Sequence, residues 1–225
     1  MPEQPQIINT QYRFSQIASF PRVIGCIDCT HIRIISPGGN DAEVFRNRKR
    51  VLFYKCSSCI VCNSDLKICN IVARWPGSAH DSTIFANSRL KATFETNEYP
   101  NCMLLGDSGY PLKRNLLTPL PAVRNRGQQL YNEAHIHTRN CIERLFGTWK
   151  RRFPILAYGL RLKLSTSLTV IVAAAVLYNI AISMREEEPP DDAADQLNYL
   201  IERGRLRVHL IRNQLVNYFE NIDNL

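Results

Sequence analysis

The chain lacks the long uncharged apolar run that a membrane-spanning helix needs. Its longest apolar stretch, LTVIVAAAVLYNIAI at 168–182, is shorter than the roughly 20 residues that cross a bilayer, and it contains Asn179. The N-terminal residues 1–4 (MPEQ) also lack the basic and apolar segments of a secretory signal. We therefore interpret 168–182 as a buried core helix and expect an intracellular protein without membrane association.

Acidic residues are in short supply. The sequence has 20 Asp and Glu against 28 Lys and Arg, a formal net charge of +8 and an isoelectric point of about 9.2. This balance favours a polyanionic partner, nucleic acid first and an acidic membrane surface second. No helix-turn-helix or zinc-finger pattern stands out, so we expect a general, salt-sensitive affinity for DNA rather than sequence-specific recognition.

Cysteine is not scarce, because the chain has eight. An intracellular location favours free thiols over a disulfide framework. The spacings Cys26-x-x-Cys29 and Cys56-x-x-Cys59-x-x-Cys62 also suggest a structural zinc site. Residues i and i+3 of a strand point to opposite faces, however, so we prefer small buried thiols and keep a zinc-structured binding module as an alternative.

Hydrophobic patterning indicates an α/β fold without internal repeats. Three consecutive strands can form an antiparallel meander, and a fourth strand after a helix can pair parallel to the first by a crossover. Ser78 and Asp81 have the spacing of a capping box at the start of a helix. We expect strands at 23–35, 51–62, 66–75 and 102–106, helices at 78–92, 133–153 and 166–184, and a loop at 109–127.

Composition divides the chain into four parts. A polar, irregular N-terminal extension is expected over residues 1–19, followed by one mixed-sheet domain over 20–185. The run EEEPPDD predicts an acidic, proline-containing linker at 186–195. A C-terminal helical tail is expected over 196–225.

Three acidic residues occupy positions that ordinary surface acids do not. Asp28 stands in the middle of an apolar strand, where burial is costly unless the carboxylate is paired or binds a metal. Asp107 ends the apolar run LLGDSGY between two glycines, as a turn residue or as a ligand presented at a strand end. Glu143 lies on the helix 133–153, where an ordinary i,i+4 pair with Arg139 is the alternative.

Together, the three acids have the layout of a metal-dependent phosphoryl-transfer site. Carboxylate oxygens suit Mg²⁺ or Mn²⁺. Two such ions can activate water and stabilise the leaving oxygen of a phosphodiester. On this interpretation Asp28, Asp107 and Glu143 are the catalytic acids and share the ions.

The helix 133–153 carries two neighbouring stripes. One stripe is apolar and should face the core; its members are Ile142, Leu145, Phe146, Trp149 and Phe153. The other brings Arg139, Lys150 and Arg151 beside Glu143, where they would hold phosphates of the nucleic-acid backbone. The basic segment 46–50 is a solvated loop or, through Arg48 and Lys49, a further phosphate contact.

Four ordered stretches resemble the successive motifs of PIF/Harbinger DDE transposases, and particularly the harbinger transposase-derived nucleases of animals. These stretches are GCIDCTHI (25–32), WPGSAHDSTIF (75–85), LLGDSGYP (104–111) and RNCIERLFGTWKRRFPIL (139–156). The resemblance covers about residues 20–185, most of the chain.

The resemblance implies an RNase H-like fold, with a five-strand-type mixed sheet flanked by helices. It implies a DNA endonuclease with Asp28, Asp107 and Glu143 as acidic triad and Mg²⁺ or Mn²⁺ as cofactor. It also implies a metal-ligand role for Asp81, which the residues alone leave equally open to a cap role. A Myb-like DNA-binding partner protein and a location in the nucleus, with the cytoplasm second, are further expectations.

Two features depart from the family pattern. The segment 55–59 reads KCSSC where the family usually has S-[IL]-N-V-Q, and residues 1–19 stand where the family normally carries a longer helical region. We interpret 1–19 as a remnant of that region. The altered segment 55–59 favours an alternative function, a domesticated and catalytically silent DNA-binding or adaptor protein, whereas the intact acids argue against it.

Overall fold

The computed structural model describes residues 1–35 and 54–190. The chain divides into two compact units, Met1–Glu186 and Glu187–Leu225, and almost all described residues belong to the first. The predicted contacts of Arg48 and Lys49, and the predicted tail 196–225, lie outside the described residues.

A five-stranded mixed sheet forms the centre of the first unit. The strands lie in the order β3-β2-β1-β4-β5; β2 pairs antiparallel with both β1 and β3, whereas β4 pairs parallel with both β1 and β5. This topology confirms the predicted meander and crossover. The strands are β1 Val23–Ile34, β2 Tyr54–Cys62, β3 Ile68–Pro76, β4 Met103–Leu105 and β5 Leu116–Leu117.

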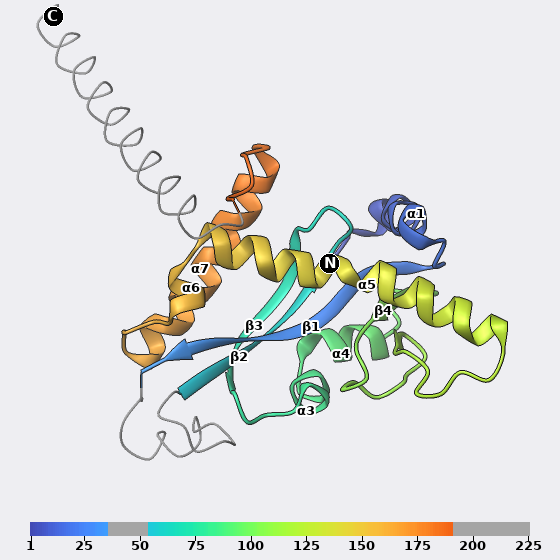
Figure 1. Ribbon diagram of the computed structural model, residues 1–225, viewed down its shortest axis with the longest axis horizontal. Coiled ribbons are helices and arrows are strands. Elements are labelled where there is room, and N and C mark those ends of the chain that lie inside the picture. The colour runs from blue at the N-terminus through green and yellow to red at the C-terminus, as the bar shows by residue number, and fades with distance from the viewer. Residues whose placement is uncertain (36–53, 191–225) are drawn as a thin grey trace, which may run out of the picture. The chain divides into compact units, whose positions relative to one another are not determined.

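Helices cover both faces of this sheet (Figure 1). α5 and α7 contribute to a hydrophobic cluster on one face, and α3 and α4 contribute to a second cluster on the other. The arrangement confirms the predicted mixed sheet flanked by helices. The helices are η1 Gln4–Gln6, α1 Ile7–Ala18, α3 Asp81–Ala86, α4 Arg89–Glu95, α5 Arg126–Arg152, α6 Ile155–Tyr158 and α7 Leu164–Ser183.

The long helix α5 buries the predicted apolar stripe. Ile142, Leu145 and Trp149 are fully buried, and the two phenylalanines of the stripe pack against the same cluster while partly exposed. The helix ends just before Pro154, as expected from the restricted backbone before a proline. It begins before the predicted residue 133, because the Asn125 side chain accepts a hydrogen bond from an N–H of the first turn.

The polar composition of residues 1–19 predicts an irregular extension, and this prediction is wrong. These residues contain α1, which buries Phe14 completely and Ile7 almost completely, seven residues apart on one side of the helix. Ile8 and Ile17 of the same helix are 79% and 43% exposed, so apolar residues occur on more than one side and the helical period is unclear, yet the two buried residues attach α1 to the core.

The predicted single helix 78–92 is wrong and is replaced by two short helices. α3 begins at Asp81 after His80, and Ser78 caps neither helix. Asn87 and Ser88 interrupt the helical path, and the Ser88 hydroxyl accepts the N–H of Lys91 at 3.1 Å to start α4. A second prediction, a loop over 109–127, is corrected by β5 and by the start of α5.

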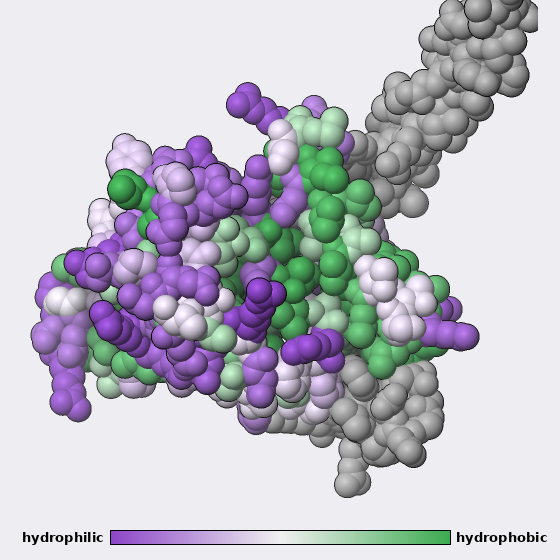
Figure 2. Space-filling view, turned by 180° about the vertical axis from the view of Figure 1, so that it is seen from behind, coloured by the Kyte–Doolittle hydropathy of each residue, from purple (hydrophilic) through white to green (hydrophobic). Residues whose placement is uncertain are grey.

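α7 is a core helix on one side only. Ile171 and Tyr178 are fully buried, whereas Val176, Leu177 and Ile180 on the other side are 55%, 51% and 48% exposed. A band of apolar residues over α7 is visible from behind (Figure 2). By length and composition α7 could also cross a membrane, a test that core helices of soluble proteins pass as well. Its apolar residues occur all round, so the sequence has no period to reveal the exposed side.

The cysteines divide between the two faces of the sheet. Cys26, Cys62 and Cys141 lie in the cluster beneath α5, where the sulfur atoms of Cys62 and Cys141 are 3.5 Å apart. Cys59 lies in the cluster on the other face. The prediction that cysteines three apart in a strand diverge is confirmed, and all eight are free thiols.

Candidate metal centre

The register of two parallel strands brings Asp28 and Asp107 close together. Cys26 of β1 pairs with Leu105 of β4, and each aspartate follows its residue of this pair by two positions. Because side chains alternate along a strand, Asp28 points to the α5 face together with Cys26, and Asp107 stands beside it in the loop that follows β4.

Asp107 is both a turn residue and a presented carboxylate. Its Oδ1 accepts the N–H of Gly109 at 2.9 Å, the local contact typical of an aspartate in a turn. A Cβ at Gly106 would lie 2.9 Å from the ring of Tyr110, and a Cβ at Gly109 would lie 3.1 Å from the Asp107 carboxylate. The two glycines therefore leave room for the buried tyrosine and for the acid itself.

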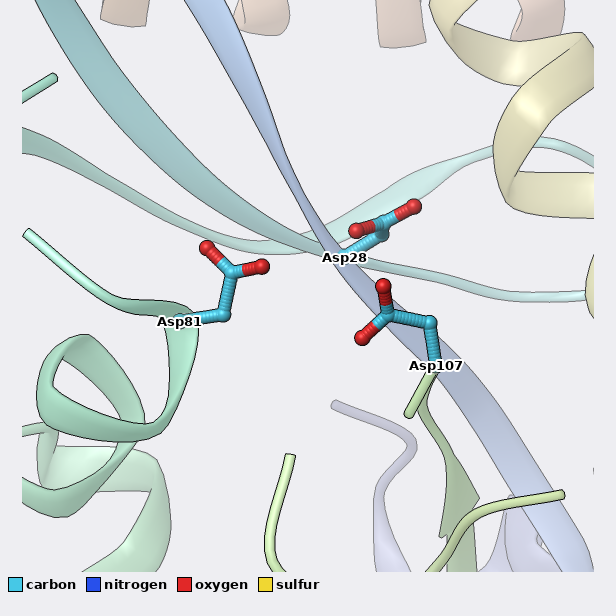
Figure 3. A group of neighbouring side chains, drawn as sticks. All are labelled: Asp28, Asp81 and Asp107. Atoms are coloured by element: carbon cyan, nitrogen blue, oxygen red, sulfur yellow. The ribbon is translucent and has the colours of Figure 1, made fainter. Parts of the chain in front are cut away.

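Asp81 is the third acid at this place. It is the first residue of α3 and reaches the other two carboxylates from a separate element (Figure 3). One carboxylate oxygen from each of Asp28, Asp81 and Asp107 lies within 4.8 Å of the others, and all three residues are half-buried. Within residues 1–35 and 54–190, no other His, Cys, Asp or Glu side chains gather in this way.

The environment of Asp28 opposes its negative charge. Burial raises the pKa of the Asp28 carboxyl to about 6, and the neighbouring Asp107 and Asp81 add to the increase. A hydrogen bond from the Cys29 N–H at 2.7 Å and the Arg139 guanidinium act in the opposite direction without cancelling the effect of burial.

Glu143 is not a member of the three-carboxylate group. It is linked to Asp28 through Arg139, whose Nη1 donates to Asp28 Oδ2 at 3.0 Å and whose Nη2 donates to Glu143 Oε1 at 2.5 Å. The i,i+4 pair that the helix alone suggests is therefore formed. The contact from Arg139 to Asp28 is one that sequence reasoning missed, although a buried strand aspartate calls for a cationic partner.

The other predicted phosphate contacts on α5 lie further along the helix. Lys150 donates to the carbonyl oxygen of His31 at 3.4 Å, and Arg151 is half-buried beside Gly147.

The three aspartates fit a hard divalent cation. They offer oxygen donors from β1, α3 and the loop after β4, so the donor set is pre-assembled by the fold. Oxygen donors of this kind suit Mg²⁺ or Mn²⁺ rather than softer metals. A bound cation would also offset the mutual repulsion that helps to raise the pKa of Asp28.

Comparison with known proteins agrees with this geometry. Residues 27–179 match the family described as "DDE superfamily endonuclease". "Putative nuclease HARBI1" of Rattus norvegicus is 31% identical over 93% of the chain and 63% of its own length, and the Homo sapiens protein of that name is 30% identical over 88% and 60%. "Protein ALP1-like" of Arabidopsis thaliana is 25% identical over 86% of the chain and 51% of its own length.

The chain thus spans about 60% of the length of the nuclease relatives that it matches. No solved structure matches it. The family match covers most of the chain and includes Asp28, Asp81, Asp107 and Glu143. The chain therefore belongs to the DDE superfamily endonucleases, and its five-stranded mixed sheet flanked by helices is the RNase H-like fold of that superfamily.

Proposed function

We propose that the protein is a divalent-metal-dependent DNA endonuclease descended from a DDE transposase. The observation that carries the proposal is the convergence of Asp28, Asp81 and Asp107 within 4.8 Å, in a chain that matches an endonuclease family. Relatives named as nucleases over most of the chain support the same class of activity.

The residues have separate roles in this proposal. Asp28, Asp81 and Asp107 hold the cation, and Glu143 on α5 completes the site from the other side of Arg139. Mg²⁺ or Mn²⁺ ions, when bound, supply activation of water and stabilisation of a departing 3′-oxygen. Arg139, Lys150 and Arg151 on the same helix position the phosphate backbone.

The test is nicking of supercoiled plasmid DNA by the purified protein in Mg²⁺ or Mn²⁺. We expect nicking that is lost in EDTA, in Asp107→Asn and in Glu143→Gln. The matched control is Glu133→Gln, which removes an exposed carboxylate of α5 that pairs with Arg126 instead of Arg139. Equal nicking by the wild type and by both active-site variants would reject the proposal.

A second candidate is a catalytically silent DNA-binding protein. The observation that favours it is the position of Glu143, which is paired with Arg139 and stands outside the carboxylate group. DNA binding that does not change with Mg²⁺ or EDTA, together with no nicking, would support this candidate.

We also propose DNA as the partner of this basic chain, with a location in the nucleus. The net charge of +8 predicts binding that weakens as salt rises. A Myb-like protein that supplies sequence recognition remains part of the proposal. Retention of the purified chain on a Myb-domain column would support it, and passage of the chain through that column would count against it.

A further inference from the structure

Arg139 joins two carboxylates that the proposed function needs at one site. Its guanidinium donates to Asp28 Oδ2 with one nitrogen and to Glu143 Oε1 with the other. The two acids come from β1 and α5 and are 115 positions apart in sequence, so the contact depends on the tertiary fold.

The contact occupies the carboxylate oxygens with which Asp28 and Glu143 would bind an ion between them. The remaining oxygen of Asp28, Oδ1, accepts the N–H of Cys29 at 2.7 Å. Both oxygens of Asp28 therefore already have hydrogen-bond donors, and the Oδ2 that faces α5 is bonded to a cation. An arginine keeps its charge at any working pH, so it can leave these oxygens only by moving.

The charges and exposures show which part of this arrangement can change. Asp28, Asp81, Asp107 and Glu143 bring four carboxylates to the region, and Arg139 contacts two of them. The side chains of Arg139 and Asp28 are 18% exposed, whereas that of Glu143 is 55% exposed. The bond to Glu143 is thus the more solvated half of the bridge, and the bond to Asp28 the more shielded half.

We propose that Arg139 is an internal counter-ion that withholds Asp28 and Glu143 from a second divalent cation. The three aspartates bind the first cation without disturbing Arg139, because Asp28 Oδ1, which accepts only the neutral Cys29 N–H, keeps a second lone pair for the ion. Binding of a second cation between Asp28 and Glu143 requires displacement of the guanidinium, so its affinity is the lower of the two. This inference rests on the proposed function, because it assumes that the aspartates bind a divalent cation.

The test counts Mn²⁺ bound to the purified protein without DNA, by calorimetric titration. In the wild type we expect one ion at the aspartates and a much weaker second ion. In Arg139→Gln we expect the second ion to bind at least about tenfold more tightly, a size typical of coupling between neighbouring sites. In the double variant Arg139→Gln/Glu143→Gln this gain should disappear, because the second ion loses Glu143 as a ligand.

The matched control is Arg144→Gln. Arg144 is an exposed cation of the same helix, so this variant removes the same charge from α5 without removing a contact to Asp28. An equal gain in Arg144→Gln would mean that net charge alone tightens metal binding and would overturn the inference. Unchanged or weaker binding of the second ion in Arg139→Gln would overturn it as well.

The direction of the effect separates this role from a structural one. If Arg139 only stabilised the fold, its replacement would loosen the site and weaken metal binding, which is the opposite result. Thermal unfolding in EDTA verifies that each variant is folded. Absence of Mn²⁺ binding in both the wild type and Asp107→Asn would instead refute the proposed function and this inference with it.

Discussion

Asp107→Asn should stabilise the metal-free protein while removing its response to metal. The carboxylate of Asp107 lies with those of Asp28 and Asp81 inside a 4.8 Å group, so it repels two neighbours. Asparagine has nearly the same shape and retains the oxygen that accepts the N–H of Gly109. The substitution therefore removes the charge and leaves the turn.

The magnitude follows from the separation of the charges. At 4.8 Å, two like charges repel by about 1 kcal/mol in water and by about 3.5 kcal/mol at an effective dielectric constant of 20. All three residues remain partly exposed to water and Arg139 partly neutralises Asp28, so we use the lower value for each of the two pairs that Asp107 forms. The expected gain is about 2 kcal/mol, which corresponds to an increase in Tm of about 4–8 °C for a chain of this size.

The assay is thermal unfolding, followed by circular dichroism in EDTA and in Mn²⁺. The wild type should gain stability with Mn²⁺, whereas Asp107→Asn should start higher in EDTA and gain little. Asp65→Asn is the control, since Asp65 forms an exposed ion pair with Arg13 and should affect Tm little in either buffer. A lower Tm of Asp107→Asn in EDTA, with a full response to Mn²⁺, would refute the reasoning.

Three further predictions concern stability. The pKa of Asp28 is about 6 in the folded protein against 3.8 for an ordinary aspartate, so between these pH values the folded metal-free protein binds more protons than the unfolded chain. The free energy of unfolding should therefore fall by at most about 3 kcal/mol as pH rises from 4 to 6. Urea unfolding in EDTA should show a weaker pH dependence in Asp28→Asn than in the wild type. Asn179→Ala removes two 2.8 Å hydrogen bonds to the backbone N–H and carbonyl of Ile68 and should lower the free energy of unfolding by about 1–3 kcal/mol in the same assay. An unchanged free energy of unfolding would contradict this prediction and would mean that water replaces both bonds. Gly25→Ala places a Cβ 2.7 Å from the Val61 side chain and should lower the free energy of unfolding by about 1–3 kcal/mol. The double variant Gly25→Ala/Val61→Ala should recover part of this loss. An unchanged urea midpoint for Gly25→Ala would contradict the prediction and would mean that the two strands move apart at little cost.

The strands β1 to β4 and the long helix α5 could be predicted from their apolar residues, whereas β5, with two residues, is too short to give a pattern. The strand pairing followed from chain order, since consecutive strands pair antiparallel and a helical connection allows parallel pairing. The helix α1 was hidden because its apolar residues lie on both buried and exposed sides, and the exposed side of α7 was hidden because apolar residues occur all round that helix. Periodicity detects a face only when the two faces differ in composition.

The site was predictable to different degrees for its different acids. Asp28 and Asp107 stand on or beside apolar strands, where a carboxylate requires a partner. Asp81 has a local explanation as an acid in the first turn of α3, so only the family resemblance indicated its place. The position of Glu143 depends on Arg139, which also binds Asp28. Because Asp28 is far from this helix in sequence, the helix alone could not reveal this contact.

The pairing of Cys26 with Leu105 has a consequence for related genes that have decayed. A copy that lost only the codon for Ile27 would still encode every acidic residue, and a motif search would count it as intact. Its first aspartate, however, would emerge beneath the opposite layer of helices, because neighbouring positions of a pleated strand alternate. Among such copies, the spacing between each acid and the paired residue of its strand indicates an intact metal site better than the mere presence of the acids does.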